Sequence, residues 1–217
     1  LRTPLTVIKG YGSMLLERTF GVIGEKANGT LEKVSIATDQ LIKMVDDLLN
    51  LSQIEAGRIK YKLADADLLA LVKEVINEFA VPAKAKGVSL HFKADAASLP
   101  MFSGDEEKLK EAISNLIDNS IKYSPQGGEV KVSLDRMDGA IRLIVKDSGM
   151  GMSEKDLGRL FTKFARSEAA QKIDPNGLGL GLYFVKRVVE DHKGKVWAES
   201  EGEGKGSAFL VELPLRR

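Results

Sequence analysis

The chain has 217 residues, which is enough for one or two domains with a buried core. Charged residues make up 29%, but the net charge is only +1, so no strong field attracts nucleic acid or an anionic membrane. The absence of cysteine excludes disulfides and thiolate metal sites and fits a reducing compartment. Neither a membrane-spanning apolar run nor a signal-peptide pattern is present. Because the first residue is Leu1 and not Met, we expect a piece of a longer protein, with any membrane portion outside it.

The first segment is predicted to be a helix from Leu1 to about Glu17. Its small and apolar residues recur in alternating steps of four and three, the spacing of a heptad seam: Leu1, Leu5, Ile8, Gly12 and Leu15. Proline lacks an amide hydrogen, so Pro4 predicts either the first helical turn or a kink.

A second helix is expected after a glycine-containing break at residues 20–29, with Thr30 as its cap and Gly57 as its stop. Its seam consists of Val34, Leu41 and Leu48, interleaved with Ala37, Met44 and Leu51. Two antiparallel helices cannot bury two such stripes as a pair, so we expect a homodimer that forms a four-helix bundle. The alternative is a hairpin packed against the rest of its own chain.

From residue 61 onward the pattern predicts mixed strands and helices. A short strand at 61–65 precedes a helix that Asp67 caps and that ends at Gly87. Strands are expected at 88–93 and 100–103, followed by an amphipathic helix over 105–121.

The C-terminal half predicts a hairpin and a final helix with two strands. Alternating runs at 129–136 and 140–146 meet at Asp138-Gly139, a turn sequence typical of hairpins. A helix over 179–191 and strands at 195–200 and 207–213 complete the chain. The fold class is therefore α+β: a helical hairpin, then an α/β two-layer sandwich whose antiparallel-rich sheet has helices on one face.

One face of the helix at 105–121 carries an unusual polar series. Glu111, Asn115, Asn119 and Lys122 are spaced by four, four and three residues, which places them opposite the apolar stripe. Asparagine is a poor helix former, so this series points to a function, although a solvated surface face is the simpler alternative. An amide oxygen can bind Mg²⁺, a carboxylate can move a proton, and a lysine can contact phosphate.

Two glycine turns follow, Asp147-Ser-Gly149-Met-Gly151 and Gly177-Leu-Gly179-Leu-Gly181, separated by a polar insert. Glycine lets backbone amides approach phosphates closely, and the helix after the second turn adds its positive end. Alone, each turn has a purely conformational explanation. Together with the polar helix face they predict one nucleotide pocket with a movable cover.

Five segments together resemble the sensor histidine kinases, in order and spacing and over essentially the whole chain. Residues 115–123 resemble the N box, the two glycine turns resemble the two glycine boxes, and 161–166 resemble the F box. Residues 1–5 resemble the tail of the phosphoacceptor box. The resemblance implies a dimerisation and histidine phosphotransfer hairpin at 1–58 and a catalytic ATP-binding domain at 61–217, with the fold of gyrase-type ATPases.

The resemblance also assigns roles on the polar helix. Asn115 would ligate Mg²⁺, with Asn119 near the triphosphate and the metal. Glu111 would assist proton transfer or position water as a catalytic group. Lys122 would contact phosphate, and Tyr123 would pack beside the purine.

The remaining ATP contacts would come from the glycine boxes and the segment between them. Asp147 would accept a hydrogen bond from the adenine amino group, with Gly149 and Gly151 allowing close approach of the base. The second box would bind ATP through Gly177, Gly179 and Gly181. Residues 152–176 would form the ATP lid, anchored by Phe161 and Phe164 and carrying Arg166 near the phosphates. Plain core packing is the alternative for the two phenylalanines.

The family's phosphorylated histidine would lie two residues before Leu1, so this chain lacks it. His91 and His192 do not stand in an acceptor context, and we assign neither a role. In the family, a Thr or Asn at the position of Thr3 can position water to dephosphorylate the regulator; helix capping is the alternative for this residue.

The resemblance implies a cytoplasmic ATP-dependent protein-histidine kinase that uses Mg²⁺ and passes its phosphoryl group to the receiver domain of a response regulator. Nucleic acid is not an expected partner, and any membrane contact would come from segments outside this chain. Two other functions fit parts of the pattern. A clamp-type ATPase shares the nucleotide fold but lacks the preceding hairpin, and a dimeric scaffold or phosphatase-only module would bind nucleotide without transferring phosphate.

Overall fold

The computed structural model describes residues 2–94 and 99–215. Leu1, the first residue of the expected phosphoacceptor tail, lies outside this range. The chain divides into two compact units, one containing residues up to Arg58 with 176–178, and the other Ile59–Pro175 with the residues from Gly179 onward. Of the helices in the described residues, none has both the length and the apolar character needed to cross a membrane.

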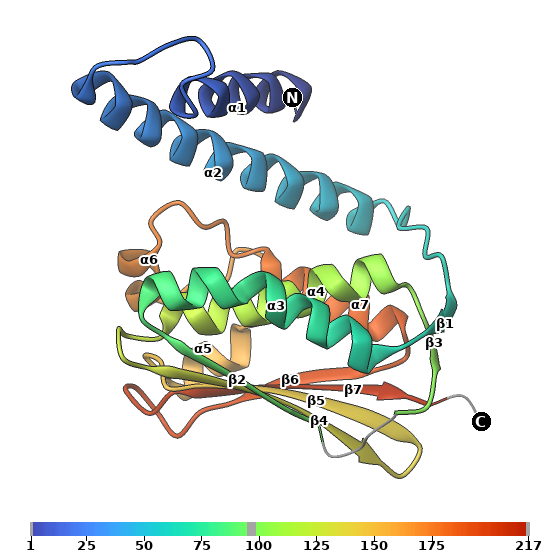
Figure 1. Cartoon of the computed structure of the whole chain (residues 1–217). Helices are drawn as coiled ribbons and strands as arrows, with labels where there is room; N and C mark the ends of the chain where they lie inside the picture. The colour runs from blue at the N-terminus through green and yellow to red at the C-terminus, as the bar shows by residue number, and fades with distance from the viewer. Residues whose placement is uncertain (1, 95–98, 216–217) are drawn as a thin grey trace. The chain divides into compact units, whose positions relative to one another are not determined.

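The first unit is a helical hairpin of α1 (Arg2–Leu16) and α2 (Glu25–Glu55) (Figure 1). Pro4 lies in the first turn of α1, where its missing amide costs nothing. Gly12 and Thr38 are buried, and the Thr38 hydroxyl donates to the carbonyl of Val34 at 2.8 Å. A small residue on each helix therefore lies in the buried part of the hairpin.

The expected cap at Thr30 is wrong. Helix α2 already begins at Glu25, and the Thr30 hydroxyl donates to the Lys26 carbonyl at 2.9 Å inside the helix. The side chain of Asn28 donates to Glu32 at 2.8 Å, a bond across one turn that offsets the poor helix propensity of residues 28 and 29. The helix ends as expected, because Gly57 adopts a left-handed φ of 61° just after it.

The second unit contains a five-stranded sheet in the order β2-β4-β5-β7-β6, in which only β2 and β4 pair in parallel. Its strands are β2 (Ser89–Ala94), β4 (Glu129–Met137), β5 (Ala140–Asp147), β6 (Lys195–Glu199) and β7 (Ser207–Pro214). The short strands β1 (Ala64–Ala66) and β3 (Phe102–Gly104) pair separately. Its helices are α3 (Leu68–Lys86), α4 (Glu106–Tyr123), α5 (Glu154–Arg159), α6 (Glu168–Ile173) and α7 (Gly181–Asp191).

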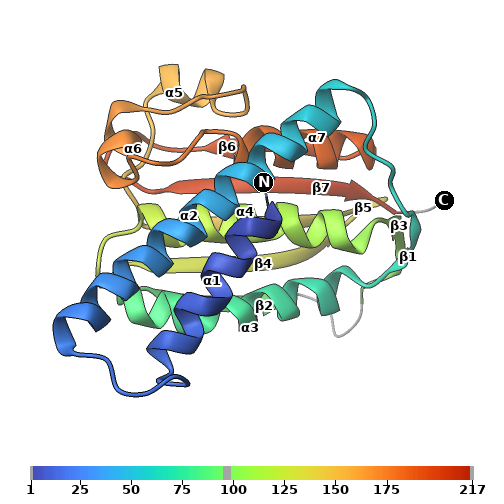
Figure 2. The ribbon, with the colours of Figure 1, turned by 90° about the horizontal axis from the view of Figure 1, so that it is seen from above.

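Helices α3, α4 and α7 cover one face of this sheet, and α4 lies between the other two (Figures 1 and 2). The apolar positions of β4 and β5 alternate and are buried, as Val132 and Val145 illustrate. The same holds for the inner face of α4, where Leu116 and Ile117 are almost completely buried. Each such side chain stabilises the fold by about 1.5–3 kcal/mol. The two-layer α+β arrangement expected from the sequence is confirmed.

Candidate functional site

Asp147 ends strand β5, and its carboxylate is held by one backbone amide of the turn that follows it and by one of the distant strand β7. Its Oδ1 accepts from the amide of Gly149 at 2.8 Å and from that of Ser207 at 3.2 Å. The residue is only 6% exposed. Both amides bind Oδ1, and the Ser120 hydroxyl also interacts with the carboxylate. A carboxylate has about four acceptor sites, so acceptor capacity remains for a ligand.

Burial raises the pKa of the Asp147 carboxyl, and the hydrogen bonds from the Gly149 and Ser207 amides oppose this shift in part. A buried carboxyl group with a shifted pKa is often part of a binding site. The cost of keeping this charge buried is the physical reason to look for a hydrogen-bonding ligand here.

The first glycine turn is tightly packed by the protein itself. A Cβ on Gly149 would lie 2.6 Å from Asp147 Oδ1 and 2.7 Å from the carbonyl oxygen of Tyr123. Gly151 has a φ of 65°, and a Cβ there would lie 2.0 Å from the Gly202 carbonyl oxygen. Both positions therefore require glycine for internal packing, whether or not a base also approaches them.

On α4, Asn115 is oriented by its own helix. Its Nδ2 donates to the carbonyl of Glu111 at 2.9 Å, which fixes which end of the amide faces outward. A Cβ on Gly181, the first residue of α7, would lie 2.6 Å from Asn115 Oδ1. The polar series on α4 and the end of the second glycine box therefore meet, although they are far apart in the sequence.

The donor set around Asn115 fits a magnesium ion that is bound mainly through phosphates. Within the described ranges, no group of three or more acidic or histidine side chains could hold a metal alone. Mg²⁺ typically keeps several waters and takes one or two protein oxygens in addition to substrate phosphates. A single outward-facing amide oxygen beside a helix start matches that requirement.

The other members of the polar series on α4, Glu111, Asn119 and Lys122, are half-buried. Glu111 pairs with Lys108 at 3.0 Å, and Asn119 lies one turn after Asn115. The Lys122 ammonium lies 5.4 Å from the centre of the Tyr123 ring. Lys122 also forms an ion pair with Asp174, which is located just after α6.

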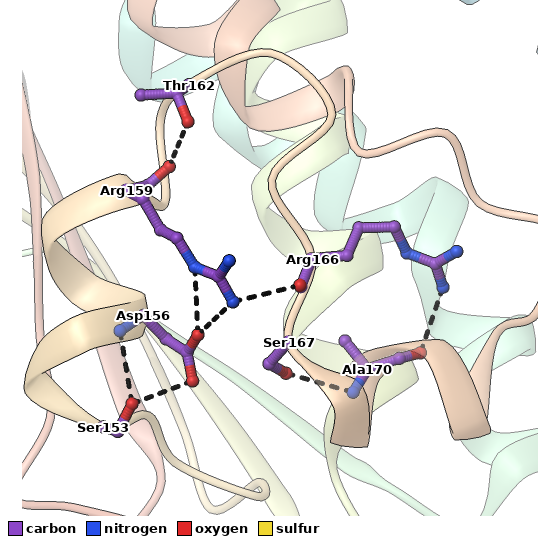
Figure 3. Close-up of polar contacts among 7 residues, drawn as sticks. All are labelled: Ser153, Asp156, Arg159, Thr162, Arg166, Ser167 and Ala170. Atoms are coloured by element: carbon purple, nitrogen blue, oxygen red, sulfur yellow. Dashed lines mark hydrogen bonds and ion pairs between the residues drawn. The ribbon is translucent and has the colours of Figure 1, made fainter.

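Residues 152–175, the part of the expected lid that belongs to the second unit, are called the lid below. Figure 3 shows Arg166 at its centre: the Arg166 carbonyl accepts from Arg159 at 3.2 Å, and its guanidinium donates to the Ala170 carbonyl at 3.1 Å. Arg159 also pairs with Asp156 at 2.7 Å. Arg166 thus links the two short helices α5 and α6, which the sequence pattern did not indicate.

The two lid phenylalanines differ. Phe161 is half-buried, but Phe164 is 58% exposed and has a positive φ of 60°. The expectation that both aromatic rings anchor the lid by burial is therefore wrong for Phe164. Its left-handed backbone, which costs a non-glycine residue about 1–2 kcal/mol, turns the side chain outward.

Three further predicted residues are described by their local backbone. Gly177 and Gly179 belong to the non-helical connection before α7, and Gly179 has a φ of 69°. Thr3 is exposed in the first turn of α1.

His192, to which no role was assigned, is a buried structural residue. Its Nε2 accepts from the Asp105 amide at 2.9 Å, its Nδ1 lies 2.7 Å from the Val188 carbonyl, and Tyr61 packs edge-on at 5.1 Å.

Sequence reasoning missed the contribution of Ser207 and Asp174. Ser207 acts through its backbone amide, which no side-chain motif records. Asp174 lies near the end of the polar insert between the two glycine turns. Its only signal in the sequence is its position before Pro175, because proline restricts the backbone of the preceding residue.

Two family models match the chain. Residues 104–217 match the family described as histidine kinase-, DNA gyrase B- and HSP90-like ATPases, and residues 1–57 match the His Kinase A (phospho-acceptor) domain. The chain belongs to the sensor histidine kinases. This pairing of domains separates it from the clamp-type ATPases.

The signal transduction histidine-protein kinase BaeS of Escherichia coli (strain K12) is 33% identical over the full chain, which covers 45% of BaeS. Full-length ShkA in complex with AMPPNP is 26% identical, with a TM-score of 0.79 over 98% of this chain and 43% of that one. Histidine kinase ThkA, in complex with response regulator protein TrrA, has a TM-score of 0.67 at 22% identity, over 99% of this chain and 58% of that one. The chain spans less than half the length of BaeS.

Proposed function

We propose that this chain is the cytoplasmic kinase core of a sensor histidine kinase, which binds Mg-ATP and transfers the γ-phosphoryl group to a histidine. The observation that carries the proposal is the meeting of Asn115 with Gly181, together with the buried Asp147 carboxylate, which Gly149 brings close to the end of α4 at Tyr123. These groups supply a phosphate and metal end and a base end for one nucleotide.

The base end would be held by Asp147, whose second oxygen accepts from the adenine amino group while the Gly149 and Ser207 amides fix the first. Tyr123 would pack beside the purine. A carboxylate that accepts a hydrogen bond selects adenine over guanine, which presents a carbonyl at the corresponding position.

The phosphate end would be held by Lys122, Arg166, the second glycine box and the N-terminus of α7. Asn115 would hold Mg²⁺, which neutralises the triphosphate when bound, and Asn119 would lie near the triphosphate and the metal. Glu111 would accept the proton of the attacking imidazole. The γ-phosphorus–oxygen bond breaks as the phosphorus–nitrogen bond forms, and ADP leaves; such transfers depend mainly on positioning and charge neutralisation.

The first unit would supply dimerisation and phosphotransfer. Its heptad residues Val34, Leu41 and Leu48 are 43%, 48% and 50% exposed, so the chain leaves this stripe uncovered. A second copy would bury the stripe in a four-helix bundle. The wild-type chain should sediment with the mass of a dimer, and Leu41→Lys should sediment with the mass of a monomer. If the variant keeps the mass of a dimer, this stripe is not the interface.

The partner of the phosphorylated histidine would be an aspartate on a response-regulator receiver domain. The phospho-acceptor match over residues 1–57 and the regulator bound to ThkA support this partner. The acceptor histidine would lie two residues before Leu1. The exposed Thr3, four positions after it, would position water for dephosphorylation of the regulator.

The test has a binding step and a transfer step. Titration of the purified chain with Mg-AMPPNP should show binding that Asp147→Asn weakens and that Asp138→Asn, an exposed control in the β4–β5 turn, leaves unchanged. In the longer protein that includes the upstream histidine, γ-labelled ATP should give an acid-labile, base-stable label that Asp147→Asn abolishes. Binding without any label would favour a scaffold or phosphatase-only module.

A further inference from the structure

The two cations assigned to the phosphates are both bound to the same short stretch of the lid. Lys122 forms an ion pair with the Asp174 carboxylate. The Arg166 guanidinium donates to the carbonyls of Ala170 at 3.1 Å, Pro175 at 3.4 Å and Asp174. Residues 170–175 therefore bind the two cationic side chains, Lys122 and Arg166, that are proposed to bind the triphosphate.

Sequence and local structure fix Asp174 at this position. The residue ends α6, where its amide donates to the Ala170 carbonyl at 3.0 Å, and Pro175 prevents the helix from continuing. Proline also restricts the residue before it to an extended backbone, and Asp174 has φ −132° and ψ 85°. The carboxylate thus leaves the helix end at a defined point.

The ion pair lies in a partly desolvated place. The side chains of Lys122 and Asp174 are 27% and 20% exposed, well below the exposure of most ion pairs on this chain's surface. A pair of this kind is stronger than a fully exposed one, because water screens it less. An ammonium that binds a carboxylate must release it, at least in part, before it can bind a phosphate at full strength.

We propose that Asp174 is a positioning residue that occupies Lys122 in the nucleotide-free chain and competes with the nucleotide phosphates for it. The inference rests on the proposed ATP-binding function and adds an internal competitor to it. When phosphate takes over Lys122, the Asp174 carboxylate turns to solvent, and the last turn of α6 loses one of its attachments to α4.

The competition predicts a dependence on phosphate. Asp174→Asn keeps the size of the side chain but removes its charge, so ATP and ADP should bind about threefold to tenfold more tightly, the range expected for one partly exposed ion pair. Adenosine carries no phosphate, and its affinity should not change. Asp174→Glu retains a carboxylate and should restore affinities close to those of the wild type.

A matched control separates the contact from a general charge effect. Glu168→Gln removes one negative charge from an exposed position of the same short helix α6. This variant should bind ATP and ADP as the wild type does. Equal gains in Asp174→Asn and Glu168→Gln would overturn the proposal, because lid charge alone would then explain the gain.

The measurement is calorimetric titration of the 217-residue chain with Mg-ATP, Mg-ADP and adenosine, accompanied by hydrogen exchange of the lid amides without nucleotide. Faster exchange at residues 171–174 in Asp174→Asn than in Asp174→Glu is expected. An Asp174→Asn chain that binds ATP no more tightly than the wild type would overturn the inference. Absence of nucleotide binding by the wild type would instead refute the proposed function itself.

Discussion

The first glycine turn and the lid differ in how far along the chain their contacts reach. In residues 147–151, Asp147 binds the amide of Ser207, Gly149 accepts from Gly206 at 3.1 Å, and the Met150 amide donates to Tyr123 at 3.2 Å. Two distant segments therefore hold the turn. In the lid, the hydrogen bonds of Figure 3 join residues no more than seven positions apart, and the ion pair of Asp174 with Lys122 adds a long-range contact at the end of the segment.

Because of this difference, the two segments of the site should differ in how easily they open. A turn fixed by long-range contacts opens only when the surrounding fold opens, whereas a segment held by short-range, exposed contacts opens locally at small cost. Helix α5 contains no buried residue, and α6 contains only Ala170. The proposed base end of the site is thus preformed, and the proposed phosphate end can rearrange around a ligand.

The largest effect expected from this contrast is on stability. Gly151→Ala combines a left-handed backbone with a Cβ that would lie 2.0 Å from the Gly202 carbonyl oxygen. It should cost about 3 kcal/mol and lower the melting temperature by roughly 6–12 °C. Gly158→Ala, in the lid helix α5 with nothing within 4 Å of its Cβ, should shift it by less than about 2 °C.

Thermal unfolding followed by circular dichroism measures both variants. Similar losses for Gly151→Ala and Gly158→Ala would mean that the turn is no more firmly held than the lid.

A second variant separates binding from folding. Gly181→Ala introduces a Cβ 2.6 Å from Asn115 Oδ1, the end of a side chain that can move aside. Stability should be almost unchanged, because alanine favours the helix that glycine begins. Displacing the amide should weaken Mg-ATP binding by about tenfold, the value of one good hydrogen bond or ligand contact. Titration at several Mg²⁺ concentrations should show the loss mainly in the metal dependence; a loss equal with and without Mg²⁺ would contradict the assignment of Asn115.

Much of the base end of the site was predictable because periodicity encodes it. Helix α4 repeats its apolar residues every three to four positions, as the sequence predicts, and Asp105 caps it by accepting from the Lys108 amide at 3.0 Å. Strand β5 alternates and then stops at Asp147, so the pattern correctly places an acidic residue at a sheet end. Gly149 and Gly151 were predicted from the turn sequence, and a Cβ at either position would clash with neighbouring protein atoms.

The phosphate end was less predictable because its contacts are specific to side-chain geometry. The pairing of Lys122 with Asp174 joins residues 52 positions apart and leaves no repeating pattern. Helices α5 and α6 have six residues each, too short to show an amphipathic period. The start of α2 was missed for the opposite reason: residues 28 and 29 look like a break, but a long helix absorbs them.

The pH dependence of binding tests the buried acid of the preformed turn. Burial raises the pKa of Asp147 above the value of about 3.9 for a free aspartate, so protonation begins at a higher pH than usual. The protonated group is a weaker acceptor, and the ratio of wild-type to Asp147→Asn affinity for Mg-ATP should shrink several-fold as pH falls toward that pKa. Titration of the phosphates cancels in the ratio; a ratio independent of pH would exclude the ionised carboxylate from binding.

The same shift has a consequence for stability with the opposite sign. Because the folded-state pKa is raised, the folded chain holds the Asp147 proton more firmly than the unfolded chain does. This contribution to stability is complete below the unfolded-state pKa and is lost as pH rises through the folded-state pKa. At neutral pH, Asp147→Asn should therefore unfold at a temperature no lower than that of the wild type.

The smallest expected effect compares two helix caps, one in each kind of region. Ser153 caps α5 in the lid, accepting from the Asp156 amide at 3.2 Å, and Asp67 caps α3 in the core, accepting from Ala70 at 3.0 Å. Loss of either cap costs its helix about 1 kcal/mol. For Asp67→Ala this is a global loss, and the melting temperature should fall by about 2–4 °C. For Ser153→Ala the loss should remain local, because α5 can unfold while the sheet stays intact, so only the amides of residues 154–159 should exchange faster. If Ser153→Ala lowered the melting temperature as much as Asp67→Ala does, the lid would unfold together with the core and could not rearrange independently around the phosphates.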